Sequence, residues 1–183
     1  MTYPRAYHTA AVLTGGKVLV MGGSDTNSTL NTVELYDPSS GSWTVSGNMI
    51  GNRYYHVSSL LNNGKVLVTG GQINSSSYLA SAELYDPLTG MWTATGNMNN
   101  ARAHHTSSIL SNGKALVTGG YDSSGSLTSA ELYNPSTGVW NVTTNMNNAR
   151  QWHTASLLPN GTMLVIGGYG NGNYLTSAEL YQP

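Results

Sequence analysis

A double glycine occurs four times in this chain at a nearly constant spacing, and this repeat constrains the fold more than any other feature. The pairs are Gly22-Gly23, Gly70-Gly71, Gly119-Gly120 and Gly167-Gly168, so the period is 48 or 49 residues. Each pair follows a short apolar run with the length of a β-strand. Repeats of this length built from short strands are typical of β-propellers, in which each repeat forms one blade. We therefore predict an all-β array.

Arginine, histidine and glutamate recur with the same period as the glycines. Each repeat has an Arg, a His three residues later and a Glu further on, in a strand-like segment. These residues are Arg5, Arg53, Arg102 and Arg150; His8, His56, His105 and His153; and Glu34, Glu83, Glu131 and Glu179. We predict one array over residues 1–183, with repeats at about 5–52, 53–101, 102–149 and 150–183.

The second repeat shows how one blade is built. Asn63-Gly64 supplies the two residues with positive φ that a tight hairpin between two strands needs. A third strand ends at Asp86-Pro87, where a turn leads into a fourth strand that contains Trp92. Apolar residues alternate with a period of two rather than 3.6, so we expect no helix. We therefore predict four antiparallel strands per blade, with the first strand, rich in small residues, nearest the propeller axis.

The double glycine after Val66-Leu67-Val68, the segment Glu-Leu-Tyr-Asp-Pro at 83–87 and the following Trp92 resemble kelch repeats. The resemblance covers essentially the whole chain and implies a kelch-type β-propeller with four blades. WD40 repeats, the rival propeller family, require a Trp-Asp pair, and none of the four Trp residues precedes Asp. Because no catalytic motif accompanies the repeats, we predict a noncatalytic binding module or scaffold.

The fourth repeat stops at Gln182-Pro183, where the other repeats continue into a fourth strand. We therefore expect the last blade to lack its outer strand and the chain to be a fragment of a larger propeller or assembly. Unpaired strand edges promote pairing with another chain. We accordingly predict self-association, with closure of the four blades into a single ring as the alternative.

The composition excludes several classes of partner. Only 8% of the residues are charged, the net charge is −1 and no basic run occurs, so we predict no binding to nucleic acid. No apolar stretch is long enough to span a bilayer, so we predict no membrane insertion. The absence of cysteine excludes disulfides and thiolate chemistry.

The polar, weakly charged composition favours an extracellular or cell-surface location, with the cytoplasm as the alternative. Four Asn-x-Ser/Thr sequences are candidate N-glycosylation sites. Their asparagines are Asn27, Asn74, Asn141 and Asn160. A chain this rich in Asn, Ser and Thr contains such sequences by chance, so they support secretion only weakly.

The repeat arginines and glutamates are the only Arg and Glu residues in the chain. Glu83 lies between Ala82 and Leu84, where an unpaired carboxylate would be costly. We interpret the four arginines and four glutamates as structural ion pairs, within or between blades. The alternative is a ring of arginines that faces an anionic ligand.

A ring-bearing residue precedes each repeat histidine at the start of the first strand. The pairs are Tyr7-His8, Tyr55-His56, His104-His105 and Trp152-His153. In a blade of antiparallel strands this position lies on the same face as the variable loops 24–30, 72–79, 121–127 and 169–175. We interpret this face as a candidate site for a protein or glycan ligand. The alternative is that the rings cap the inner strands and that the histidines are structural.

The segments 5–8, 53–56 and 150–161 also resemble a segment of galactose and glyoxal oxidases. In that family the Tyr and His of this segment bind copper, which would correspond to Tyr7-His8 and Tyr55-His56. The family also needs a tyrosine crosslinked to a cysteine, and this chain has no cysteine. We therefore predict no enzymatic activity, no metal and no cofactor. The alternative is an enzyme, of the copper-oxidase or a sugar-converting type, that uses the His/Arg face.

Overall fold

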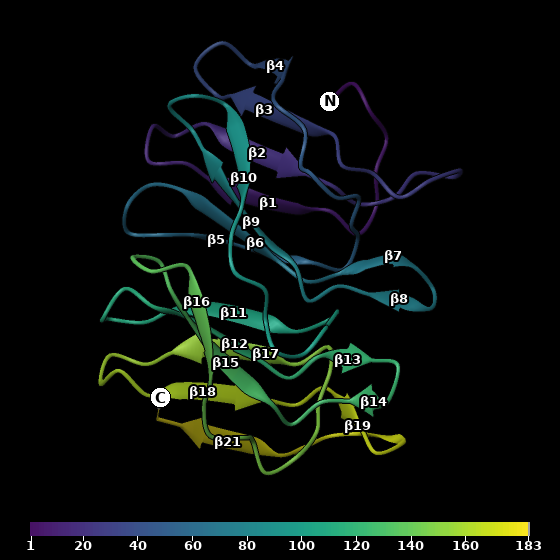
Figure 1. The fold of residues 1–183 in the computed structure, drawn as a ribbon, viewed down its shortest axis with the longest axis vertical. Helices are drawn as coiled ribbons and strands as arrows, with labels where there is room; N and C mark the ends of the chain where they lie inside the picture. The colour runs from purple at the N-terminus through teal and green to yellow at the C-terminus, as the bar shows by residue number, and fades with distance from the viewer. Residues whose placement is uncertain (183) are drawn as a thin grey trace.

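The computed structural model describes residues 1–182 and places them in strands and turns only (Figure 1). Pro183, the last residue of the predicted fourth repeat, lies outside the described residues. Within the described part of the chain, no helix could cross a membrane. The predicted all-β fold is confirmed.

Four sheets repeat along the chain, and we call them blades 1 to 4. Blade 1 consists of β1 (Thr9–Val12), β2 (Val18–Met21), β3 (Val33–Asp37) and β4 (Ser42–Val45). Blade 2 consists of β5 (Val57–Leu60), β6 (Val66–Thr69), β9 (Ala82–Asp86) and β10 (Met91–Ala94). Blade 3 consists of β11 (Thr106–Ile109), β12 (Ala115–Thr118), β15 (Ala130–Asn134) and β16 (Val139–Val142). Blade 4 consists of β17 (Thr154–Leu157), β18 (Met163–Ile166) and β21 (Ala178–Tyr181), so the three-stranded last blade is confirmed as well.

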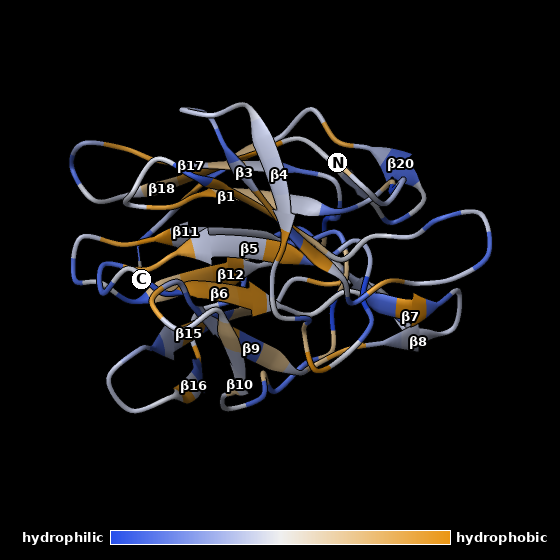
Figure 2. Cartoon of the chain, turned by 90° about the horizontal axis from the view of Figure 1, so that it is seen from above, coloured by the Kyte–Doolittle hydropathy of each residue, from blue (hydrophilic) through white to orange (hydrophobic). Residues whose placement is uncertain are grey.

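The first strand of each blade is the innermost, as predicted from its small residues. Strand β1 contacts β5, β5 contacts β11, and β11 contacts β17. Figure 1 shows blade 1 at the top and blade 4 at the bottom, with β5 and β11 between β1 and β17. Figure 2 shows the outer strands β10 and β16 on one side of the molecule and β4 on the opposite side. The blades of residues 1–182 therefore form an open arc and not a closed four-bladed ring.

The hydrophobic core lies between successive blades. Val66 and Val68 of β6 pack toward blade 1, where they meet the buried Leu19. Leu67, on the opposite face of the same strand, packs against Val117 of blade 3. Because both faces of each middle sheet are buried, the second strands are apolar at consecutive positions and do not alternate.

The double glycine ends the second strand in a conformation that other residues do not fit. Gly119 has a φ of +59°, and a Cβ atom on it would lie 2.5 Å from the carbonyl oxygen of Arg150 and 2.8 Å from Cε1 of His153. The next residue, Gly120, donates its N–H to the same Arg150 carbonyl at 2.8 Å. The glycine pair thus lets two blades approach each other through their backbones.

Three of the predicted loops contain short hairpins, so their description as loops is corrected. The hairpins are β7–β8 (Gln72–Asn74 and Ser77–Tyr78), β13–β14 (Tyr121–Asp122 and Gly125–Ser126) and β19–β20 (Tyr169–Gly170 and Asn173–Tyr174). In Figure 1 the labelled hairpin strands lie at one end of the molecule. Side-chain hydrogen bonds tighten their turns, as where Asp122 Oδ1 accepts the Ser124 N–H at 2.7 Å.

Candidate functional site

Four rings form a continuous row across the blades, and we call this row the aromatic ladder. Its members are Tyr7, Tyr55, His104 and Trp152, one from each blade. Ring centroids are 4.4 Å apart for the first pair, 4.0 Å for the second and 5.2 Å for the third. Trp152 Nε1 also donates a hydrogen bond to His104 Nδ1 at 2.8 Å. The structure therefore brings together the four ring-bearing residues that the sequence singled out.

The ladder has an unusual backbone conformation. Its members have φ values between 54° and 57°, in the left-handed region that residues with a side chain seldom adopt. A backbone hydrogen bond joins each member to the next: Tyr55 N–H donates to the Tyr7 carbonyl, His104 to Tyr55 and Trp152 to His104, each at 3.2 Å. These bonds between blades stabilise the conformation, which residue types alone do not indicate.

The histidines after the ladder residues are separated from the rings. Nε2 of each buried histidine lies close to a threonine hydroxyl of the preceding blade: His56 to Thr9 at 2.9 Å, His105 to Thr69 at 2.9 Å and His153 to Thr106 at 3.0 Å. Burial lowers the pKa of His56 to about 3 and that of His153 to about 4, so both are neutral near pH 7. This corrects the prediction that His56, His105 and His153 line the candidate face, because buried imidazoles cannot reach a ligand there. His8 alone among the four is exposed.

Each repeat arginine pairs with the glutamate of its own blade. The pairs are Arg5–Glu34 at 3.4 Å, Arg53–Glu83 at 2.5 Å, Arg102–Glu131 at 2.8 Å and Arg150–Glu179 at 2.5 Å. Burial raises the pKa of Glu131, but hydrogen bonds from Asn99, Asn100 and Arg102 outweigh this effect and hold the pKa below its usual value. Because the guanidinium groups are buried against carboxylates, they do not form a ring open to an anionic ligand.

The residues that match the copper ligands of the oxidases do not converge. The Tyr55 ring lies in the ladder, whereas the His56 imidazole is buried against Thr9. Within residues 1–182, no three His, Asp or Glu side chains are grouped as a metal site requires. With no cysteine to crosslink a tyrosine, the residues present do not fit a copper-radical centre.

Two shallow depressions lie beside the aromatic ladder, near its members from blades 1 and 2. One, of about 340 Å³, is lined by Tyr7, Ser24 and Asp25, and a second, of about 430 Å³, is lined by Tyr54 and Asn74 among others. Both lie where the segment before the first strand meets the loop after the second strand. Aromatic faces beside short polar side chains can bind a weakly charged ligand by stacking and hydrogen bonding.

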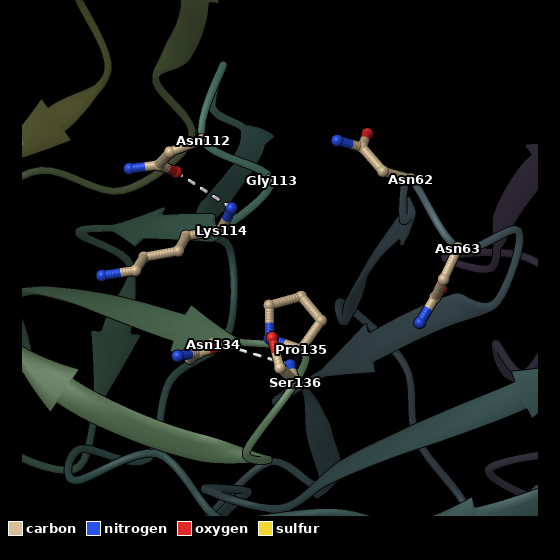
Figure 3. Close-up of a pocket in the computed structure, with 8 residues that line it drawn as sticks. All are labelled: Asn62, Asn63, Asn112, Gly113, Lys114, Asn134, Pro135 and Ser136. Carbon is tan, nitrogen blue, oxygen red and sulfur yellow. Dashed lines mark hydrogen bonds between the residues drawn. The ribbon is translucent and has the colours of Figure 1, made fainter.

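The opposite end of the molecule carries a pocket of about 490 Å³ between turns (Figure 3). Two of its asparagine side chains already bond to their own turns: Asn112 Oδ1 accepts the Lys114 N–H and Asn134 Oδ1 accepts the Ser136 N–H, each at 3.0 Å. None of the residues that line it carries an aromatic ring. The pocket is therefore a gap between hairpin turns, and the ladder is the stronger candidate site.

The four candidate glycosylation sites are all exposed in the structure. Asn27 and Asn74 lie in the loops beside the ladder and line the same depression. Asn141 lies on the outer strand β16, and Asn160 lies in the turn before β18. Their modification stays a prediction.

The fold and the repeated contacts agree with one family model. The model described as the KLHDC2/KLHL20/DRC7 Kelch-repeats domain matches residues 7–182, which include all four blades. None of the curated proteins that were compared matches the chain.

Proposed function

The chain belongs to the kelch-repeat family, and from this membership we propose that it binds an extended segment of a partner protein along its aromatic ladder. Kelch-repeat domains generally bind protein partners or act as scaffolds. The observation that carries the proposal is the ladder itself, with Tyr7 54% and Trp152 58% exposed at its two ends. In this function the site holds its ligand without chemical change.

The geometry of the ladder favours a linear ligand. A row of rings in contact across successive blades offers one continuous aromatic surface, and the hairpins β7–β8, β13–β14 and β19–β20 lie at the same end of the molecule. Rings of this kind bind proline, aromatic and aliphatic side chains, while polar loop residues can bond to a peptide backbone. Asp25 and Asp122 are the only carboxylates in the loops 24–30, 72–79, 121–127 and 169–175, so we expect the partner segment to be neutral or weakly basic.

A glycan is the second candidate ligand. Tyr169 lies 5.9 Å from the Trp152 ring and 5.4 Å from the Tyr174 ring, so the ladder continues into an aromatic cluster on blade 4. Exposed rings next to amide and hydroxyl side chains also suit the apolar faces and hydroxyl groups of a sugar. Binding measurements with peptides and with sugars separate the two ligand classes.

A displayed library of random linear peptides and an array of neutral oligosaccharides are the probes. We expect the chain to enrich peptides whose affinity falls at least tenfold with Trp152→Asn, since Asn tolerates the left-handed backbone that Trp152 adopts. Leu88→Asn is the matched control, because Leu88 is exposed in a turn at the opposite end. Sugar binding that depends on Trp152 would favour the second candidate. Binding that is insensitive to Trp152→Asn would refute the ladder as the site.

A further inference from the structure

Three internal interfaces join the four blades with similar contacts, although the threonine belongs to the first strand at two of them, as Thr9 and Thr106, and to the second strand at the other, as Thr69. The preceding blade offers a threonine hydroxyl and a ladder carbonyl, and the following blade offers a histidine ring and a ladder N–H. Between blades 2 and 3, for example, His105 Nε2 lies 2.9 Å from Thr69 Oγ1, and His104 N–H donates to the Tyr55 carbonyl at 3.2 Å. The interface has a direction, because its two halves are different.

The two ends of the arc expose the two different halves of this interface. On blade 1, His8 and Tyr7 occupy the positions that His105 and His104 occupy on blade 3, and both are exposed. On blade 4, Thr154 occupies the position of Thr9 on blade 1, and it is exposed as well. One end thus carries the histidine and the ladder N–H, and the other end carries the threonine and the Trp152 carbonyl.

The outward sheet face of blade 4 is apolar. The pairing of β18 with β21 places Leu164, Ile166, Ala178 and Leu180 on one face, because Leu164 pairs with Leu180 and Ile166 with Ala178. The corresponding residues of blades 1, 2 and 3 pack against the next blade, whereas Leu180 is 69% exposed. An exposed apolar sheet face favours association with another sheet.

The outward sheet face of blade 1 is apolar too, like that of blade 4. Val12, which is 62% exposed, projects from the inner strand β1 on this face, beside Val18 of β2. The acidic Glu34 on the same face is already held by Arg5 and by the backbone N–H of Thr2. Docking this face therefore leaves no unpaired charge to be desolvated, and the cost of association stays low.

We propose that this chain assembles head to tail, with blade 1 of one copy docked on blade 4 of a second copy. His8 then contacts Thr154 of the second copy, and Tyr7 N–H donates to the carbonyl of its Trp152. The junction repeats the contacts between blades 1 and 2 and between blades 3 and 4, and it extends the aromatic ladder from one copy into the next. Such heterologous contacts close into a ring when the rotation allows it and otherwise give longer arrays.

Sedimentation velocity and light scattering on the 183-residue chain test this assembly. We expect species that are multiples of 19.4 kDa and grow with protein concentration. Val12→Lys and Leu180→Lys each place a charge on one of the two docking faces without disturbing the core, since both side chains are exposed. Each variant alone should be monomeric, with the circular dichroism spectrum of the unchanged chain. Leu88→Lys, in an exposed turn away from both faces, should assemble like the unchanged chain.

Mixing the two variants gives the decisive result. Val12→Lys retains an intact blade 4 face and Leu180→Lys an intact blade 1 face, so the mixture should form a heterodimer and nothing larger. A monomeric unchanged chain at high concentration would overturn the proposal. So would a mixture that stays monomeric, or a single variant that still dimerises, since that contact would join like faces.

Discussion

The guanidinium of Arg102 donates a hydrogen bond to Glu131 Oε1 across 2.8 Å, and both side chains are completely buried. Arg102 also donates to the carbonyl of Gly119 at 2.7 Å, while Glu131 accepts the backbone N–H of Asn99 at 2.6 Å. One ion pair therefore ties together the entry to the inner strand, the double glycine and the third strand. Because the pair recurs in each blade, it is the main polar element of the repeat.

Glu131→Gln should lower the free energy of unfolding by about 3–5 kcal/mol, because it leaves the Arg102 charge buried without a counter-charge. Urea denaturation followed by circular dichroism measures the change. Asp86→Asn is the control, since the Lys65–Asp86 pair at 3.2 Å is partly exposed and contributes little. Equal effects of the two substitutions would show that burial does not set the strength of the Arg102–Glu131 pair.

Gly119→Ala should destabilise the chain by more than about 1–2 kcal/mol, the cost of a left-handed backbone for a residue with a Cβ. The added methyl group would also lie 2.5 Å from the Arg150 carbonyl oxygen. Gly15→Ala is the control, because a Cβ there meets nothing within 4 Å and its φ is not positive. Thermal melting of the two variants should separate them clearly, and an unchanged Tm for Gly119→Ala would contradict the close approach of blades 3 and 4.

His153→Gln should flatten the dependence of stability on pH between about pH 4 and 6.5. Burial lowers the pKa of His153 to about 4 in the folded chain, from the ordinary histidine value of about 6.5. Between these two values the unfolded chain binds more protons, so the free energy of unfolding falls as the pH falls. Urea midpoints measured from pH 4 to 7 give the slope. His8→Gln, at an exposed site, should change the slope less, and a larger effect there would be inconsistent with the buried position of His153.

Tyr133→Phe should cost about 0.5–1.5 kcal/mol, because the Tyr133 hydroxyl bonds to Thr95 Oγ1 of the preceding blade at 2.7 Å. Tyr36 occupies the same position in blade 1, and its hydroxyl has no hydrogen-bond partner among residues 1–182. Tyr36→Phe is therefore a closely matched control and should leave stability nearly unchanged. Chemical denaturation of both variants tests whether these tyrosines strengthen contacts between blades.

The fold was predictable because its signals are local. Asn63-Gly64, Asp86-Pro87 and the double glycines mark turns by their backbone preferences, and the apolar runs mark strands. The open arc was not predictable, since closure depends on the angle between blades, which side-chain type does not encode. The loop at 121–127 was missed as a hairpin, although Gly125 next to Asp122-Ser123-Ser124 was an available turn signal.

The candidate site was predictable in part. The recurrence of Tyr7, Tyr55, His104 and Trp152 identified the rings, yet pairing each ring with its neighbouring histidine in one site was wrong. The positive φ of each ladder residue turns its ring to the surface and leaves the next side chain between the blades. That conformation accompanies hydrogen bonds between residues about 48 positions apart, such as Tyr55 N–H to the Tyr7 carbonyl, and residue type alone does not indicate it.

Each hairpin beside the ladder forms one isolated backbone bridge to the segment before the first strand of its own blade, such as Ala103 to Tyr121 or Gln151 to Tyr169. Residues beyond the bridge, from Asp122 to Gly125 for example, are exposed or half-buried and take no part in the core. The blades thus form a framework and the hairpin tips can set ligand specificity, as the sheets and the binding loops do in an antibody variable domain. New recognition can arise by exchanging hairpin tips, in evolution or in a designed library, while the core between successive blades stays unchanged.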